Sequence, residues 1–246
     1  MTCVRKAAAT VAVAVTLVAS LLVLRPAPVA AATASSAVRP AATSVLAQPV
    51  LRYGARGSAV VTLQRRLAAL RYDAGPVDGV FGYSTLHAVV AFQKVNRLAR
   101  DGVVGPLTWA ALARPYVPRP RHTSSAYFVE VDLTRQVVYL ARYGAVQRTL
   151  DASTGSGQLY RSGGAWHRAV TPVGEFRVYR RYNGWETGPL GALWRPNYFT
   201  GGYAVHGSTS VPAYPASHGC VRVTVPAMDR LWGLLTIGTR VSLYRT

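Results

Sequence analysis

The spacing of the apolar residues changes once along this chain, and this change limits what the chain can fold into. Before residue 114, Val60, Leu63 and Leu67 recur every three or four positions, which places them on one face of an α-helix. After residue 125, Val129 and Val131 follow the alternating period of a β-strand. Because one regular element cannot follow both periods, we predict two domains of different classes.

The first domain is expected to span residues 51–113 and to be a small, all-α bundle of three helices. Ser58 is suited to cap the first helix, and Ser84 or Thr85 to open the second. Pro106 is suited to the first turn of a third, short helix. Three such helices can bury their apolar faces only against one another, so we predict a bundle.

A short internal repeat lies within this bundle. Residues 78–82 read Asp-Gly-Val-Phe-Gly, and residues 101–105 read Asp-Gly-Val-Val-Gly, so each copy begins with a turn-forming dipeptide. The repeat resembles the peptidoglycan-binding domain of many wall hydrolases, which also shares the strings Leu63-Gln64, Ala91-Phe92-Gln93 and Thr108-Trp109. The resemblance implies that residues 51–113 bind peptidoglycan.

The second domain is expected to span residues 126–246 and to be mostly β-structure. The proline- and arginine-rich segment 114–125 is typical of a stiff linker between domains. One helix is predicted from about Pro226 to Leu235, with Thr224 as its cap. Short strands are predicted at 127–132, 137–140, 176–179, 203–205 and 241–244.

Residues 1–34 have the organisation of a secretory signal. Arg5 and Lys6 precede an uncharged apolar run, and small residues then offer a cleavage site after Ala32 or Ala34. The alternative is an uncleaved single-span anchor, since the apolar run is about long enough to cross a bilayer. Either interpretation predicts a secreted, wall-associated protein outside the cytoplasm.

The charge of the chain limits its partners. The sequence carries 28 basic and 9 acidic residues, a formal net charge of +19, which favours polyanionic surroundings such as nucleic acid, anionic lipid or an acidic cell wall. Export argues against nucleic acid, so we expect anionic wall polymers as possible further partners. Residues 35–50 are rich in Ala, Ser, Thr and Pro and are predicted to be a disordered lead-in.

Only one cysteine remains once the signal segment is set aside. Cys3 lies within that segment, so Cys220 has no partner for an intramolecular disulfide. A lone cysteine in an exported protein is either a buried, inert residue or a reactive thiol. Its neighbours in the sequence favour the second alternative.

Strand alternation indicates which way the residues around Cys220 face. If Val221 and Val223 point into the core, Cys220 and Arg222 point to the opposite, open side. The same alternation turns His206 away from the core, because its valine neighbour points inward. We therefore expect the thiol and the imidazole to share one cleft.

A cysteine nucleophile needs a base, because an ordinary thiol is mostly protonated at neutral pH. His206 is the natural partner, and His218 is expected to orient the site or to donate a hydrogen bond. Gly207 and Gly219 allow the backbone to approach closely, and the N–H groups around Gly219 and Cys220 are candidate donors to an oxyanion.

Two further roles are open at these positions. Arg222 is suited to hold a substrate carboxylate by paired hydrogen bonds. His206, His218 and Cys220 are also three acceptable zinc ligands, although no second acidic or histidine shell is evident nearby. The cysteine nucleophile is favoured over zinc, and we predict neither a metal nor a cofactor.

Residues 126–245 resemble the catalytic domain of L,D-transpeptidases of the YkuD type. The shared strings are Val129 to Leu133, Ser153-Thr154-Gly155, 171–176, His206-Gly207 and, most specifically, Ser217-His218-Gly219-Cys220-Val221-Arg222. The resemblance implies that Cys220 is the acylated nucleophile and His206 its base. It also implies that the carbonyl of Gly207 holds the histidine.

The same resemblance implies which residues bind the substrate. The stretch 185–199 is similar to a loop that covers the cleft, so Trp194, Asn197 and Tyr198, with Ser217 and Arg222, are expected to bind substrate. Core residues under a long loop are the equal alternative for the aromatic side chains.

The implied enzyme is a monomer that joins peptidoglycan stem peptides by 3→3 crosslinks. An L,D-carboxypeptidase that gives the same thioester to water, and a non-catalytic wall-binding protein, are the alternatives.

Overall fold

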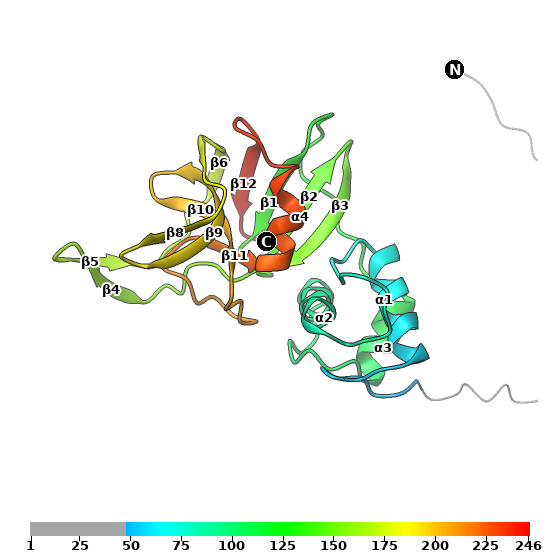
Figure 1. Cartoon of the computed structure of the whole chain (residues 1–246). Coiled ribbons are helices and arrows are strands. Elements are labelled where there is room, and N and C mark those ends of the chain that lie inside the picture. The colour runs from blue at the N-terminus through cyan, green and yellow to red at the C-terminus, as the bar shows by residue number, and fades with distance from the viewer. Residues whose placement is uncertain (1–47) are drawn as a thin grey trace, which may run out of the picture. The chain divides into compact units, whose positions relative to one another are not determined.

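The computed structural model describes residues 48–246 (Figure 1). The expected signal segment 1–34 lies outside the described residues, as does the lead-in up to residue 47. Within the described part of the chain, no helix has both the length and the apolar character needed to span a bilayer.

The first part of the described chain is a bundle of three helices, as predicted. The helices are α1 (Ser58–Ala69), α2 (Tyr83–Val95) and α3 (Pro106–Ala113). Leu63, Phe81 and Phe92 are fully buried between them. Each fully buried apolar side chain of this size contributes about 1.5–3 kcal/mol to folding.

Two of the predicted helix starts are wrong by one or two residues. Gly57 and Gly82 occupy the N-cap positions of α1 and α2, and neither helix has a side-chain cap. Ser58 lies inside the first turn, and Ser84 and Thr85 lie inside the second helix. Pro106 is the first residue of α3, as expected.

The sequence repeat corresponds to a repeated hydrogen-bond pattern. The Gln64 amide donates to the carboxylate of Asp78 at 2.8 Å and accepts from the N–H of Gly79 at 2.9 Å. Gln93 does the same at Asp101, with distances of 2.7 and 2.9 Å. Both glutamines are buried, so each satisfies its own polar groups while fixing one Asp-Gly turn.

The second part of the chain is mostly β-structure and contains two five-stranded sheets. In the first, the central strands β1 (Phe128–Asp132) and β12 (Arg240–Tyr244) are parallel, which joins the beginning of the domain to its end. The other strands of this sheet are β2 (Val137–Arg142), β3 (Ala145–Asp151) and β6 (Gly174–Arg177).

The second sheet carries the predicted site. Its strands run in the order β11 (Val221–Thr224), β10 (Tyr203–Ser208), β9 (Gly191–Thr200) and β7 (Arg180–Arg181), and β8 (Trp185–Gly188) pairs with β9. A separate hairpin consists of β4 (Leu159–Ser162) and β5 (Ala165–Arg168).

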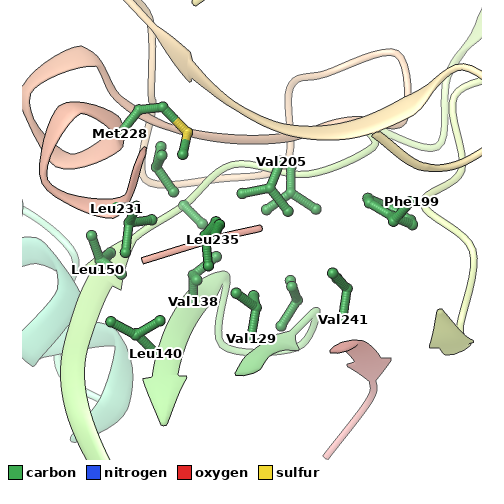
Figure 2. Packing of buried hydrophobic residues seen from close by; sticks show 14 of the residues in the cluster. Val129, Val138, Leu140, Leu150, Phe199, Val205, Met228, Leu231, Leu235 and Val241 are labelled. Carbon is green, nitrogen blue, oxygen red and sulfur yellow. The ribbon is translucent and has the colours of Figure 1, made fainter. Parts of the chain in front are cut away.

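One helix, α4 (Val225–Trp232), follows β11 directly, near its predicted place. The Thr224 hydroxyl caps it by accepting from the N–H of Ala227 at 3.2 Å. Met228 and Leu231 face inward from this helix and meet side chains from both sheets (Figure 2). Val205 and Val221 belong to the same core, so their strand neighbours face the other way.

The helical bundle and the β-domain share buried residues. Val137 and Tyr139 from β2 belong to the same apolar cluster as the helices. Lys94 of α2 is buried and donates to the Asp151 carboxylate at 2.5 Å and to the carbonyl of Ala152 at 2.8 Å. The linker therefore connects two parts with a common core, which the sequence did not indicate.

Candidate active site

A cleft of about 330 Å³ opens on the side of the second sheet that faces away from the core. Five of the predicted residues line it, namely His206, Ser217, His218, Cys220 and Arg222. The thiol and both histidines thus come together, as the sequence predicts.

The register of two strands explains this grouping. Strands β10 and β11 run parallel, with Val205 opposite Val221 and His206 opposite Arg222. The valine pair is buried in the core, so alternation turns the histidine and the arginine toward the cleft. The predicted facing of these residues is confirmed.

His206 is held as a neutral base. Its Nδ1 lies 2.9 Å from the carbonyl oxygen of Gly207, as the family resemblance implied. A carbonyl can only accept, so Nδ1 carries the proton and Nε2 keeps a free lone pair. Burial lowers the pKa of His206 to about 4; the Gly207 hydrogen bond opposes this shift, and the charge of Arg222 adds to it. The imidazole is therefore neutral at neutral pH.

The Cys220 thiol is protonated at rest. Burial raises its pKa, although a backbone hydrogen bond with Ala204 and the nearby charge of Arg222 act in the opposite direction. Its Sγ donates to the carbonyl of Gly202 at 3.6 Å. Among residues 48–246, no hydrogen bond joins this sulfur to His206, so the structure holds a neutral pair rather than a preformed thiolate and imidazolium.

Ser217 has a structural task in this arrangement. Its hydroxyl donates to the carbonyl of Cys220 at 2.6 Å and accepts from the N–H of Gly219 at 3.0 Å. The hydroxyl therefore fixes the turn before the cysteine, which does not support its predicted role in substrate binding. The Gly219 N–H is also occupied, which leaves the N–H of Cys220 as the candidate oxyanion donor.

The two glycines beside the reactive residues are required by close packing. A Cβ on Gly219 would lie 2.5 Å from the ring of Tyr203, and the residue has a φ of +137°. A Cβ on Gly207 would lie 2.8 Å from the indole of Trp194 and 3.1 Å from Met228. Neither glycine lines the cleft itself, and a side chain at either position would displace the backbone next to His206 or Cys220.

Thr171 is a supporting residue to which the sequence analysis assigned no role. Its hydroxyl donates to the carbonyl of Gly219 at 2.7 Å and accepts from the N–H of Gly155 at 2.8 Å. It thereby joins the turn before Cys220 to the segment after β3. Only the family string 171–176 contained this residue, and a string alone does not indicate which hydroxyl is buried.

The stretch 185–199 is a β-hairpin made by β8 and β9, and not a loop. Trp194, Asn197 and Tyr198 do not line the cleft, which gives no support to their predicted role in substrate binding. Asn197 is fully buried and bonded to Arg181, while the Tyr198 hydroxyl donates to Glu186 at 3.0 Å.

The Trp194 indole packs against the core and donates to Asp229 at 2.6 Å. The alternative that these residues belong to the protein interior therefore describes them better. Residues 190–193, near the tip of the hairpin, are the part that lines the cleft.

Tyr160 is a wall residue of the cleft to which the sequence analysis assigned no role. It comes from the separate β4–β5 hairpin, and its ring centroid lies 4.6 Å from that of His218. The Gly163-Gly164 dipeptide between two short strands was the available signal for this hairpin.

Arg222 brings a positive charge to the cleft. Its side chain is half-buried, and burial lowers its pKa without removing the charge that an arginine keeps at neutral pH. Within the described residues, its guanidinium makes neither a hydrogen bond nor an ion pair with another side chain. An anionic ligand group is the partner that such a cation lacks.

The described residues provide no set of ligands for the zinc ion considered as an alternative. Across residues 48–246, no three His, Cys, Asp or Glu side chains gather closely enough to hold a metal ion. His206, His218 and Cys220 share the cleft without forming such a group.

Comparison with known proteins gives two family matches in this chain. The model of a peptidoglycan binding domain matches residues 56–112. The model of the L,D-transpeptidase catalytic domain, YkuD, matches residues 126–243. The two matches cover the helical bundle and the β-domain respectively.

One solved structure is similar over almost its whole length. The crystal structure of an L,D-transpeptidase from Xylanimonas cellulosilytica is 49% identical, with a TM-score of 0.76 over 79% of this chain and 97% of that chain.

Curated relatives match over shorter segments. An uncharacterized protein of Kitasatospora aureofaciens is 48% identical over 66 residues, which is 26% of this chain and 56% of that protein. An N-acetylmuramoyl-L-alanine amidase of Mycobacterium tuberculosis is 45% identical over 56 residues, 23% of this chain and 14% of that protein. The chain thus spans about half of the first relative and much less of the second.

Proposed function

Because this chain belongs to the L,D-transpeptidase family, we propose that it crosslinks peptidoglycan stem peptides through a thioester on Cys220. The observation that carries the proposal is the state of His206. This histidine is neutral, its Nε2 is free, and it lines the same cleft as the cysteine. A neutral base beside a protonated thiol is the starting point for nucleophilic attack on a carbonyl.

In the first step, the Cys220 thiol leaves the Gly202 carbonyl and gives its proton to Nε2 of His206. The sulfur then forms a bond to the carbonyl carbon of the third stem residue. The bond from this carbon to the nitrogen of the terminal D-alanine breaks, and the amine leaves with the proton from His206. The N–H of Cys220 stabilises the developing oxyanion.

In the second step, the side-chain amine of a neighbouring stem attacks the thioester. His206 accepts a proton from this amine, a new amide bond forms, and the carbon–sulfur bond breaks. The sulfur recovers its proton and returns to the resting state. Atoms and charge balance without a metal or a redox cofactor, and the product is a 3→3 crosslink.

Arg222 is proposed to hold a carboxylate of the donor stem. It is the cation in the cleft wall without a partner among the described residues, and planar paired hydrogen bonds suit a carboxylate. Its charge also favours the thiolate over the thiol, because a nearby positive charge lowers a thiol pKa.

The helical bundle is proposed to hold the enzyme on the wall. Binding to peptidoglycan would raise the effective concentration of stems around the cleft without any new contact inside it. Both domain families act on cell-wall material, which supports a location outside the cytoplasm.

The decisive experiment is mass spectrometry of the products formed from a disaccharide-tetrapeptide by the full chain. We expect a crosslinked dimer that has lost one terminal D-alanine. The intact mass of the protein during turnover should also increase by the mass of an acyl group on Cys220. Cys220→Ala is the matched control, and its side chain is small enough to leave the fold unchanged.

Each of the other outcomes would support a different function for this chain. A tripeptide product without a dimer would identify an L,D-carboxypeptidase. Full activity of Cys220→Ala would overturn the thioester mechanism, and an inactive wild type that still binds wall material would favour the binding protein.

A further inference from the structure

The hairpin β4–β5 stands apart from both five-stranded sheets. Among the described residues, its strands pair only with each other (Figure 1). The glycines at its tip, Gly163 and Gly164, have φ values of +57° and +81°. These angles suit a tight two-residue turn that matches the twist of the strands. The outer edges of both strands therefore pair with no other strand of the described chain.

One face belongs to the cleft. The ring of Tyr160 lies 4.6 Å from that of His218 and 5.5 Å from that of His167, its cross-strand partner. At the base of the hairpin, the N–H of Ser156 donates to the carbonyl of Ser217 at 2.9 Å. The hairpin is thus hydrogen-bonded to the segment that carries the reactive cysteine.

The opposite face points to solvent, and we call it the outer hairpin face. Strand alternation places Arg161 and its partner Trp166, with Leu159 and its partner Arg168, on this side. The side chains of Leu159 and Trp166 are 59% and 69% exposed. Exposed large apolar groups of this kind mark binding surfaces when they gather on one element.

The charges on this face indicate the ligand. Arg161 makes no hydrogen bond or ion pair within residues 48–246, and Arg168 donates once, to the carbonyl of Gly157 at 2.9 Å. An indole offers a flat apolar surface to the C–H face of a sugar ring, and a guanidinium has several N–H donors for the hydroxyl and amide oxygens of a sugar. The pairing of the two suits a saccharide.

We propose that the outer hairpin face binds the saccharide part of the peptidoglycan strand whose stem occupies the cleft. The inference rests on the proposed function, because it uses the same polymer. Its independent support is that one pair of strands carries both the cleft-wall residue Tyr160 and the outer hairpin face. The site would be specific for donors that carry sugar and would not contribute to the binding of a bare stem peptide.

The test compares two ligands on the full chain. Calorimetry in a Cys220→Ala background gives the Kd of the disaccharide-tetrapeptide and of the sugarless tetrapeptide. Trp166→Ala should weaken binding of the disaccharide form about fivefold to tenfold, the size expected of one aromatic contact, and should leave binding of the bare peptide unchanged. Arg161→Gln should act in the same direction with a smaller effect.

Tyr143→Ala is the matched control, because Tyr143 is 64% exposed on the turn between β2 and β3, outside the cleft wall. Equal weakening of both ligands, or no weakening of either, would overturn the inference. Turnover by the wild type is measured separately. An inactive wild type would refute the proposed enzyme while the two binding constants still decide the role of the hairpin.

Discussion

Two buried polar centres of this protein balance burial differently. At the contact between the helical bundle and the β-domain, burial lowers the pKa of Lys94, the charge of Asp151 opposes this shift, and the amine donates to Asp151, Gln136 and Ala152, at 2.5, 3.1 and 2.8 Å. In the cleft, Cys220 and His206 have both moved toward their neutral forms and make no bond to each other.

The difference separates a structural site from a reactive one. A buried charge is tolerated when every donor has an acceptor, and the resulting group has no capacity left for chemistry. The neutral pair in the cleft leaves an unused lone pair on the histidine. A buried polar group that still has an unused donor or acceptor is therefore a better marker of the candidate active site than a buried group whose hydrogen bonds are all made.

The largest effect on stability is expected from Lys94→Met. This change leaves the buried Asp151 carboxylate with the His87 imidazole, 2.6 Å away, as its remaining side-chain partner among residues 48–246. Loss of one partner from a buried ion pair costs about 3–5 kcal/mol, and the free energy of unfolding from urea titration should fall by about that amount. Arg97→Met, at an exposed position just after α2, is the control for the lost charge.

Cys220→Ala sharpens the same comparison, because it should leave the unfolding free energy nearly unchanged. If Lys94→Met were as stable as wild type, the proposed contrast between the two centres would fail. The same result would show that the bundle and the β-domain do not depend on this ion pair.

A smaller loss of stability is expected from Gly207→Ala. The new Cβ would lie 2.8 Å from Trp194, and such overpacking typically costs about 1–3 kcal/mol. Because the carbonyl of Gly207 orients His206, the turnover rate should fall as well as the free energy of unfolding. Gly233→Ala is the control, since that position has open space around it. A stable, fully active Gly207→Ala would show that the histidine does not need this anchor.

The smallest effect is expected from His206→Ala on the rate at which the Cys220 thiol is alkylated. The raised pKa of Cys220 means less thiolate at neutral pH, so iodoacetamide should react slowly with the free enzyme. The rate should rise with pH and should be about the same in His206→Ala, because no hydrogen bond links the two residues at rest. Fast alkylation in the wild type and slow alkylation in His206→Ala would instead reveal a preformed ion pair.

Much of the site follows from local rules. The alternation of Val221 and Val223 was enough to place Cys220 and Arg222 on the open side, because a strand has only two faces. The anchoring of His206 by its neighbouring carbonyl followed from the family string and is a contact between adjacent residues.

What the sequence missed depends on the hydrogen-bond partner that each side chain uses. Ser217 was expected to bind substrate, but its hydroxyl is used within its own turn, and no spacing rule indicates this. Trp194 was assigned to the cleft because the stretch 185–199 resembles a covering loop, with a place in the core as the equal alternative. The indole packs against the core and donates to Asp229, 35 positions away.

The sharing of Val137 and Tyr139 with the helices was also hidden, because a proline-rich linker normally separates independent units. Deletion of residues 51–113 would therefore uncover part of the β-domain's apolar surface. Substitution within the bundle is a better test of wall binding than its removal.

The raised pKa of Cys220 has a consequence for the lifetime of the enzyme. Oxidants such as peroxide attack thiolates much faster than thiols, and oxidation beyond the sulfenic acid is irreversible for most proteins. If the protein acts outside the cytoplasm, as proposed, no glutathione pool repairs such damage. In the proposed mechanism, the sulfur stays protonated until a substrate meets it beside His206, so it is reactive during catalysis and inert in between. The burial that slows its chemistry at rest therefore also preserves it.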